Sequence, residues 1–210
     1  MRLVIFIKQR YVQRALVSEI YNPQSTNLLI HANKMSDHLV DIVNEKDEVI
    51  GQDLKSHKKT KWFISRAVAI FLVRSNGKFL LFKRAAHKED APNVFDIIAG
   101  NILQWESYAN AAQREVQEEV NIVCPLQLLE TFYQEANFNG SIRKIFCGLF
   151  VGVTDDEMQL NDELVEIKEM SFEKLEEQID LHPEDFSPGL VNDFIQVKDQ
   201  LRKLIHNPKF

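Results

Sequence analysis

Three glutamates stand close together in one short segment of the chain. Glu115, Glu118 and Glu119 occupy positions i, i+3 and i+4, so in a helix their carboxylates share one face. Like charges at this spacing weaken an isolated helix by about 0.2–0.5 kcal/mol per pair. A bound divalent cation reverses that effect, because Mg²⁺ and Mn²⁺ prefer carboxylate oxygens. The alternative is an acidic face that simply contacts solvent.

Residues upstream of the three glutamates favour the metal site over the solvated face. Gly100 follows the apolar run Ile97-Ile98-Ala99, and we expect it in the loop between a strand and the helix. A glycine there lets the backbone approach a metal ion or a phosphate closely. Glu106 and Arg114 add one more acid and one base between Gly100 and the glutamates.

The spacing of these residues resembles the Nudix box. Gly100, five free positions, Glu106 and seven free positions lead into Arg114-Glu115-Val116-Gln117-Glu118-Glu119-Val120-Asn121-Ile122. At about 6% usage per fixed residue, chance predicts on the order of 10⁻⁵ such matches in a chain of this length. The chain is therefore identified as a member of the Nudix hydrolases, and the solvated face is set aside.

The resemblance implies a role for each residue of the box. Glu115 and Glu119 would be the main ligands of Mg²⁺ or Mn²⁺, with Glu118 and the Gly100 carbonyl completing the set. Arg114 would hold Glu106 or Glu118 by charge-assisted hydrogen bonds. Water would attack phosphorus in a diphosphate-containing small molecule, for example a nucleoside diphosphate.

The general base and the residues that hold the substrate stay open at this level. A glutamate of the box such as Glu118 could accept the proton, and so could Glu163 or Glu166 further along the chain. Lys83 and Arg84 end a predicted strand and are candidates for binding substrate phosphate, although a solvated strand end explains them equally well.

Two departures from the box concern its backbone. Asn121 replaces the final glycine, and asparagine is the next-best residue for a left-handed helix end. Trp105 precedes Glu106 where many family members have glycine, which puts the loop after Gly100 in doubt.

Outside the box, the chain is similar to the branch of the family that is akin to type I isopentenyl-diphosphate isomerase. Isomerisation in those enzymes needs a cysteine and histidine metal ligands, but Ala99, Asn101 and Ser65 occupy the aligned positions. We therefore expect no isomerase activity. A non-catalytic binding module of the same fold is the other alternative, and such modules commonly lose the box glutamates that this chain keeps.

The elements that position these residues are readable from apolar periodicity and turn signals. Strands with intervening helices predict an α/β sandwich around a mixed sheet, the architecture that the resemblance also implies. Two Asn-Gly pairs predict long hairpins. The predicted elements are strands at 39–43, 49–50, 67–74, 78–84, 128–138, 141–153 and 164–170, helices at 107–120, 172–179 and 189–205, and a loop at 55–61.

Composition limits the class of protein. The 210 residues are 45% hydrophobic and carry a net charge of −6, which suits a folded domain and gives no basic excess for a nucleic-acid polymer. No apolar run approaches the ~20 residues of a membrane span.

Cys124 and Cys147 form no metal or CxxC pattern, so we expect free thiols in a cytoplasmic protein. Homodimers are common in the family, so a homodimer is one candidate state.

Residues 1–34 differ from the rest of the chain. An apolar run is followed by the loop-like segment Asn22 to Asn27, and the family resemblance starts only near Asp37. We predict an N-terminal extension at 1–34 that the fold can do without, and a Nudix domain at 35–210. The apolar Leu3 to Ile7 argues the other way, because it could add an edge strand.

Overall fold

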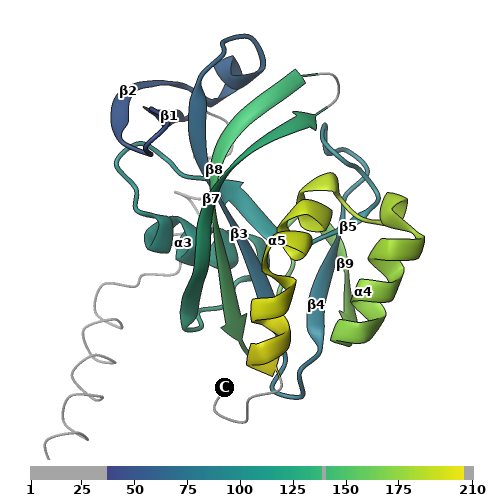
Figure 1. The fold of residues 1–210 in the computed structure, drawn as a ribbon. Helices are drawn as coiled ribbons and strands as arrows, with labels where there is room; N and C mark the ends of the chain where they lie inside the picture. The colour runs from purple at the N-terminus through teal and green to yellow at the C-terminus, as the bar shows by residue number, and fades with distance from the viewer. Residues whose placement is uncertain (1–36, 139–140, 206–210) are drawn as a thin grey trace, which may run out of the picture. The chain divides into compact units, whose positions relative to one another are not determined.

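The computed structural model describes residues 37–138 and 141–205, and the predicted extension at 1–34 lies outside them. The sheet contains β1 (Leu39–Val43), β2 (Val49–Leu54), β3 (Ile64–Val73), β4 (Phe79–Arg84), β5 (Phe95–Asp96), β6 (Ile98–Asn101), β7 (Leu126–Phe138), β8 (Ser141–Val153) and β9 (Leu164–Met170). The helices are η1 (Lys55–Lys59), α3 (Tyr108–Val120), α4 (Phe172–Leu181), η2 (Pro183–Asp185) and α5 (Pro188–Ile205) (Figure 1). Among the described residues, no helix is long and apolar enough to span a bilayer.

Strand β3 is the centre of the sheet. It runs parallel to β8 along its whole length, from Ile64↔Lys144 to Val73↔Val153. Its other edge is therefore shared in succession by β1, β6 and β4, all antiparallel. The sheet branches where β3 passes from β6 to β4. This mixed sheet with helices confirms the predicted α/β sandwich.

The two faces of the sheet bury two separate apolar cores. Alternate residues of β3 face opposite sides, so Phe71 packs with α4 and α5 whereas Ile70 packs with α3. Figure 1 shows α3 on one side of the sheet and the α4–α5 pair on the other. The near-continuous apolar runs of the sequence are explained by this double coverage.

Most predicted elements are present, but the structure corrects several limits. Strand β2 runs to Leu54 rather than Ile50, β3 begins at Ile64 rather than Ala67, and β5 was not predicted. Residues 55–61 were expected to form a loop, but Lys55–Lys59 form a 3-10 helix. Gly100 was expected in a loop, but it lies in β6, paired with Val68 of β3. Strand β6 has only four residues, too few for a period-2 pattern to distinguish it from a loop. Both cysteines are buried free thiols, as predicted.

Candidate active site

Helix α3 presents the acidic residues of the site. The Ser107 side chain caps its N-terminus by accepting from the Asn110 amide, which satisfies one of the helix's orphan N–H groups. The helix ends at Asn121 in the left-handed conformation, with φ 56°, so asparagine does replace the glycine there as expected. Its apolar face is buried against the sheet through Ala111, Ala112, Val116 and Val120.

Glu115 and Glu119 are buried although they are acids, and each keeps only 9% of its surface exposed. Burial raises the pKa of Glu115, while the adjacent Arg114 opposes the rise. The pKa of Glu119 is raised well above its usual range by burial and then by the nearby Glu115 and Glu163 carboxylates. Two buried carboxylates that repel each other form an environment that a cation would stabilise.

Gly100 lies directly against the Glu115 carboxylate. A Cβ atom at position 100 would fall 1.9 Å from both Cδ and Oε1 of Glu115. Only a glycine can therefore occupy this position without displacing the carboxylate. The contact places the backbone of β6 beside the acidic face of α3.

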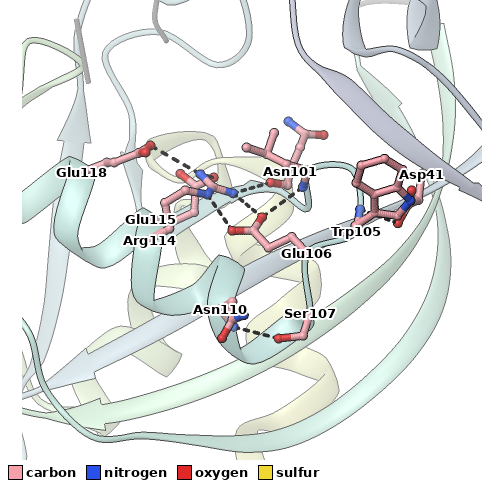
Figure 2. Close-up of polar contacts among 10 residues, drawn as sticks. Asp41, Asn101, Trp105, Glu106, Ser107, Asn110, Arg114, Glu115 and Glu118 are labelled. Carbon is pink, nitrogen blue, oxygen red and sulfur yellow. Dashed lines mark hydrogen bonds and ion pairs between the residues drawn. The ribbon is translucent and has the colours of Figure 1, made fainter. Parts of the chain in front are cut away.

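Arg114 holds the acids in place (Figure 2). Its guanidinium makes a two-pronged contact with Glu106, with both distances 2.8 Å, and also donates to the Asn101 carbonyl at 2.8 Å. Its Nη1 reaches Oε1 of Glu115 at 2.7 Å and Oε2 of Glu118 at 3.3 Å. The arginine thus contacts both Glu106 and Glu118, the two partners that the sequence offered as alternatives.

Glu163 is brought to α3 by Asn161, in the segment before β9. The Asn161 amide donates to the Glu119 carbonyl at 2.9 Å, and its side chain donates to the Glu118 carbonyl at 3.2 Å. The Asn161 side-chain oxygen in turn accepts from the Glu163 amide at 2.8 Å. Glu163 forms an ion pair with Lys88. Both residues come from distant segments of the chain and lie close enough to Glu119 to act on its charge.

Glu166 and Lys83 lie on the other face of the sheet. They are paired across β4 and β9, with Nζ and Oε2 3.9 Å apart. Lys83 contacts the ring of Phe95, which packs with the α4–α5 core. The structure therefore does not bring Glu166 and Lys83 together with the glutamates of α3.

Arg84 is engaged within the protein. It donates to the backbone carbonyls of Asp90 and Ala91, and to Oδ2 of buried Asp96 at 3.1 Å. Asp96 also accepts from the Ser187 hydroxyl at 2.6 Å. Asp96 contributes to the raised pKa of Glu119, so Arg84 neutralises an acid close to the site.

The loop from β6 to α3 accommodates Trp105 in a conformation that favours glycine. Its φ is 60° and its backbone N–H donates to Oδ2 of Asp41 at 3.2 Å. Figure 2 shows Trp105 beside Asp41, apart from the Arg114 cluster. Glu106, the next residue, still accepts from the Leu103 amide at 3.0 Å. The substitution therefore leaves the support of the box intact.

Sequence reasoning missed Lys88, Asn161 and Asp96. Asp96 and Asn161 lie outside the spacing of the box and belong to no motif of their own, so no local signal marks their contacts. Lys88 alone carries a weak signal, because it follows the Lys83-Arg84 strand end by a short polar turn. Their roles become visible only through contacts between distant segments.

The chain resembles known proteins in sequence and fold. The profile described as NUDIX domain matches residues 64–190. A Nudix hydrolase of Deinococcus radiodurans is 38% identical over 89 residues, which cover 42% of this chain and 52% of that relative. An isopentenyl-diphosphate Delta-isomerase of Pectobacterium atrosepticum is 26% identical over 161 residues, which cover 75% of this chain and 90% of the isomerase.

The crystal structure of DR0079 from Deinococcus radiodurans shares the fold, with a TM-score of 0.63 and 24% identity over 79% of this chain and 98% of that one. The chain matches about half the length of the Deinococcus hydrolase. The NUDIX profile, in contrast, covers more than half of this chain. On that match, the chain belongs to the NUDIX domain family.

Proposed function

We propose that this chain hydrolyses a diphosphate linkage in a small substrate of the nucleoside diphosphate type, with Mg²⁺ or Mn²⁺ as cofactor. The observation that carries the proposal is the pair of buried carboxylates, Glu115 and Glu119, on adjacent turns of α3. Burying two like charges is costly, and a hard cation offsets that cost with the ligand type it prefers.

The donor chemistry of the site fits such a cation. Glu115, Glu118 and Glu119 are oxygen donors, and the absence of a Cβ at Gly100 lets a backbone carbonyl approach them. Among residues 37–138 and 141–205, no three acidic, His or Cys side chains are already grouped around a common point. Arg114 contacts both Glu115 and Glu118 and keeps their carboxylates from meeting at one point. We therefore expect Glu118, whose side chain is 30% exposed, to move when the cation binds.

The cation, when bound, would neutralise the diphosphate and make a bound water more acidic. The protein's own residues would position the metal ligands and accept the proton from water. Arg114 fixes Glu106 and orients the metal-binding carboxylates, as an outer partner of the ligands. Glu118 and Glu163 are our candidates for taking the proton from water, because Glu118 precedes Glu119 on α3 and the Glu163 carboxylate is close enough to Glu119 to raise its pKa. Glu166 is not, because it lies on the opposite face with Lys83.

A panel of diphosphate compounds tests the proposal. Purified full-length chain is incubated with nucleoside diphosphates, nucleotide sugars, dinucleotides and isopentenyl diphosphate, with Mg²⁺ or Mn²⁺, in ¹⁸O-labelled water. We expect cleavage of at least one compound with the label in a phosphate product. Label in a non-phosphate product, or no cleavage of any compound, would contradict the proposal.

The same panel separates the two rival functions. An isomerase would convert isopentenyl diphosphate to its isomer without label. The similarity to the Pectobacterium isomerase favours this rival, but Ala99, Asn101 and Ser65 lack the acid–base and metal-binding groups it needs. A binding module would retain a compound unchanged, and the intact set of box glutamates argues against that outcome.

A further inference from the structure

The C-terminal turn of α3, which carries two of the box glutamates, is hydrogen-bonded to the segment just before β9. Asn161 donates its backbone N–H to the Glu119 carbonyl at 2.9 Å and its side-chain N–H to the Glu118 carbonyl at 3.2 Å. The Gln159 N–H donates to the Val120 carbonyl at 3.0 Å. The last four carbonyls of a helix have no partner within it, and this segment satisfies three of those of α3.

Asn161 also fixes the backbone of Glu163. Its side-chain oxygen accepts from the Glu163 N–H at 2.8 Å, which is the turn that asparagine forms with the residue two positions ahead. The Glu163 carbonyl accepts from the Ala85 N–H at 2.8 Å, and the Glu163 carboxylate forms an ion pair with Lys88. The amide, the carbonyl and the carboxylate of Glu163 are therefore all held by the protein itself.

Glu163 and Glu118 differ in what else their carboxylates do. Glu118 is a proposed ligand of the cation and accepts from Arg114 at 3.3 Å. A carboxylate that binds a cation shares its lone pairs with it, so it is a poorer acceptor for a proton. Glu163 lies outside the box, and its carboxylate is close enough to Glu119 to contribute to the raised pKa of that residue. Glu163 thus lies near the proposed metal ligands without being one of them.

We propose that Glu163 takes the proton from the attacking water, and that Asn161 is the residue that positions it. The proposal rests on the proposed function and chooses between the two candidate bases. Asn161 sets the place of Glu163 relative to α3, because it bonds to both. In the reaction, the water oxygen forms a bond to phosphorus as its proton passes to the Glu163 carboxylate. The bond from that phosphorus to the bridging oxygen breaks, and the second phosphate leaves with that oxygen and the electron pair.

Steady-state hydrolysis and Mn²⁺ binding by the full chain test the role of Glu163. Glu163→Gln should lower kcat at least ~10²-fold, the scale of a lost general base, and leave KM within about threefold. Glu166→Gln is the matched control and should keep its kcat, because Glu166 lies three residues on but pairs with Lys83 on the other face. Mn²⁺ titration followed by electron paramagnetic resonance should show unchanged affinity in Glu163→Gln and weaker binding in Glu119→Gln.

A double-mutant cycle tests the role of Asn161. Asn161→Ala removes the acceptor of the Glu163 N–H and should lower kcat about 10- to 100-fold, the scale of misplacing a reacting group by up to 1 Å. Asn161→Ser keeps an acceptor there and should recover at least half of the loss in log kcat. In the Glu163→Gln background, Asn161→Ala should change kcat by less than about twofold, because Asn161 acts through Glu163. Thermal unfolding confirms that each variant is folded.

Three results would overturn the proposal. They are undiminished kcat in Glu163→Gln, weaker Mn²⁺ binding in that variant, and an equal loss from Asn161→Ala in the presence and absence of the Glu163 carboxylate. Each of them differs from failure of the proposed function, in which the wild-type chain hydrolyses no diphosphate compound and both proposals fall.

Discussion

Replacing Gly100 with alanine should damage the site without damaging the fold. The new Cβ would lie 1.9 Å from Oε1 and 2.4 Å from Oε2 of Glu115, and real Cβ atoms essentially never approach closer than 3.0 Å. The carboxylate must therefore retreat by about 1 Å. The atoms in conflict are the tip of a flexible side chain, so the backbone of β6 can remain in place.

The displacement translates into a loss of rate. A shift of about 1 Å in a positioned group costs on the order of 10²-fold in activity. The shift also disturbs the 2.7 Å contact between Glu115 and Arg114, and with it the arginine that holds Glu106 and Glu118. We expect Gly100→Ala to lower kcat/KM about 100-fold and to weaken Mg²⁺ binding by 10- to 100-fold, roughly the effect of losing a supporting contact.

The assay combines steady-state hydrolysis, Mg²⁺ titration and thermal unfolding. Gly51→Ala is the matched control, because a Cβ there would meet only Ile42 Cδ1 at 4.0 Å. It controls for the general effect of replacing a glycine in a strand. If Gly100→Ala keeps its activity within about twofold of the Gly51→Ala control, then Glu115 does not need its observed position, and the reasoning fails.

Three other predictions concern stability and the chain's beginning. Arg84→Gln should lower the free energy of unfolding by about 3 kcal/mol in urea titrations, because it leaves buried Asp96 without its ion-pair partner; an unchanged value would show that Arg84 is not needed to neutralise Asp96. Burial, and secondarily Asp96, raises the pKa of Asp193 from its ordinary 3.8 to about 8, so the stability this group contributes is full below pH 3.8 and is lost as pH rises through 8. Asp193→Asn should therefore flatten that decline and raise the unfolding midpoint at pH 8 by at least ~2 °C; the same slope in both proteins would contradict this. A chain beginning at Met35 should keep its activity and unfold within a few degrees of the full chain, as differential scanning calorimetry can check, whereas an insoluble product would show that residues 1–34 belong to the fold.

The parts that sequence predicted well are those specified locally. The turn at Asn76-Gly77 joins β3 to β4 as expected, because few residues other than glycine accept a positive φ, here 83°. Helix α3 was predicted to begin near Ser107 and end at Val120, and its cap and apolar spacing fix both limits. The box residues Glu106, Arg114 and Glu115 likewise meet because their spacing on one loop and one helix dictates it.

The parts that sequence could not predict depend on pairing between distant segments. Lys88 and Glu163 form an ion pair across 75 positions of the chain, and no pattern in either segment indicates the other. Glu163 and Glu166 appeared equivalent in sequence, but Glu163 lies just before β9, where Asn161 ties it to α3, whereas Glu166 lies within β9 and pairs with Lys83 on the other face. Lys58 was read as part of a polar loop because its partner, Asn101, lies 43 residues away.

The central claim is that the buried glutamates of α3 hold the cation on which hydrolysis depends. The most direct measurement is the rate of diphosphate hydrolysis as a function of Mg²⁺ concentration for wild type, Glu119→Gln and the exposed control Glu173→Gln, each confirmed as folded. The account predicts no turnover in excess EDTA, a loss of at least ~10²-fold in Glu119→Gln, and no loss in the control. Full activity in EDTA, or undiminished turnover in Glu119→Gln, would contradict it.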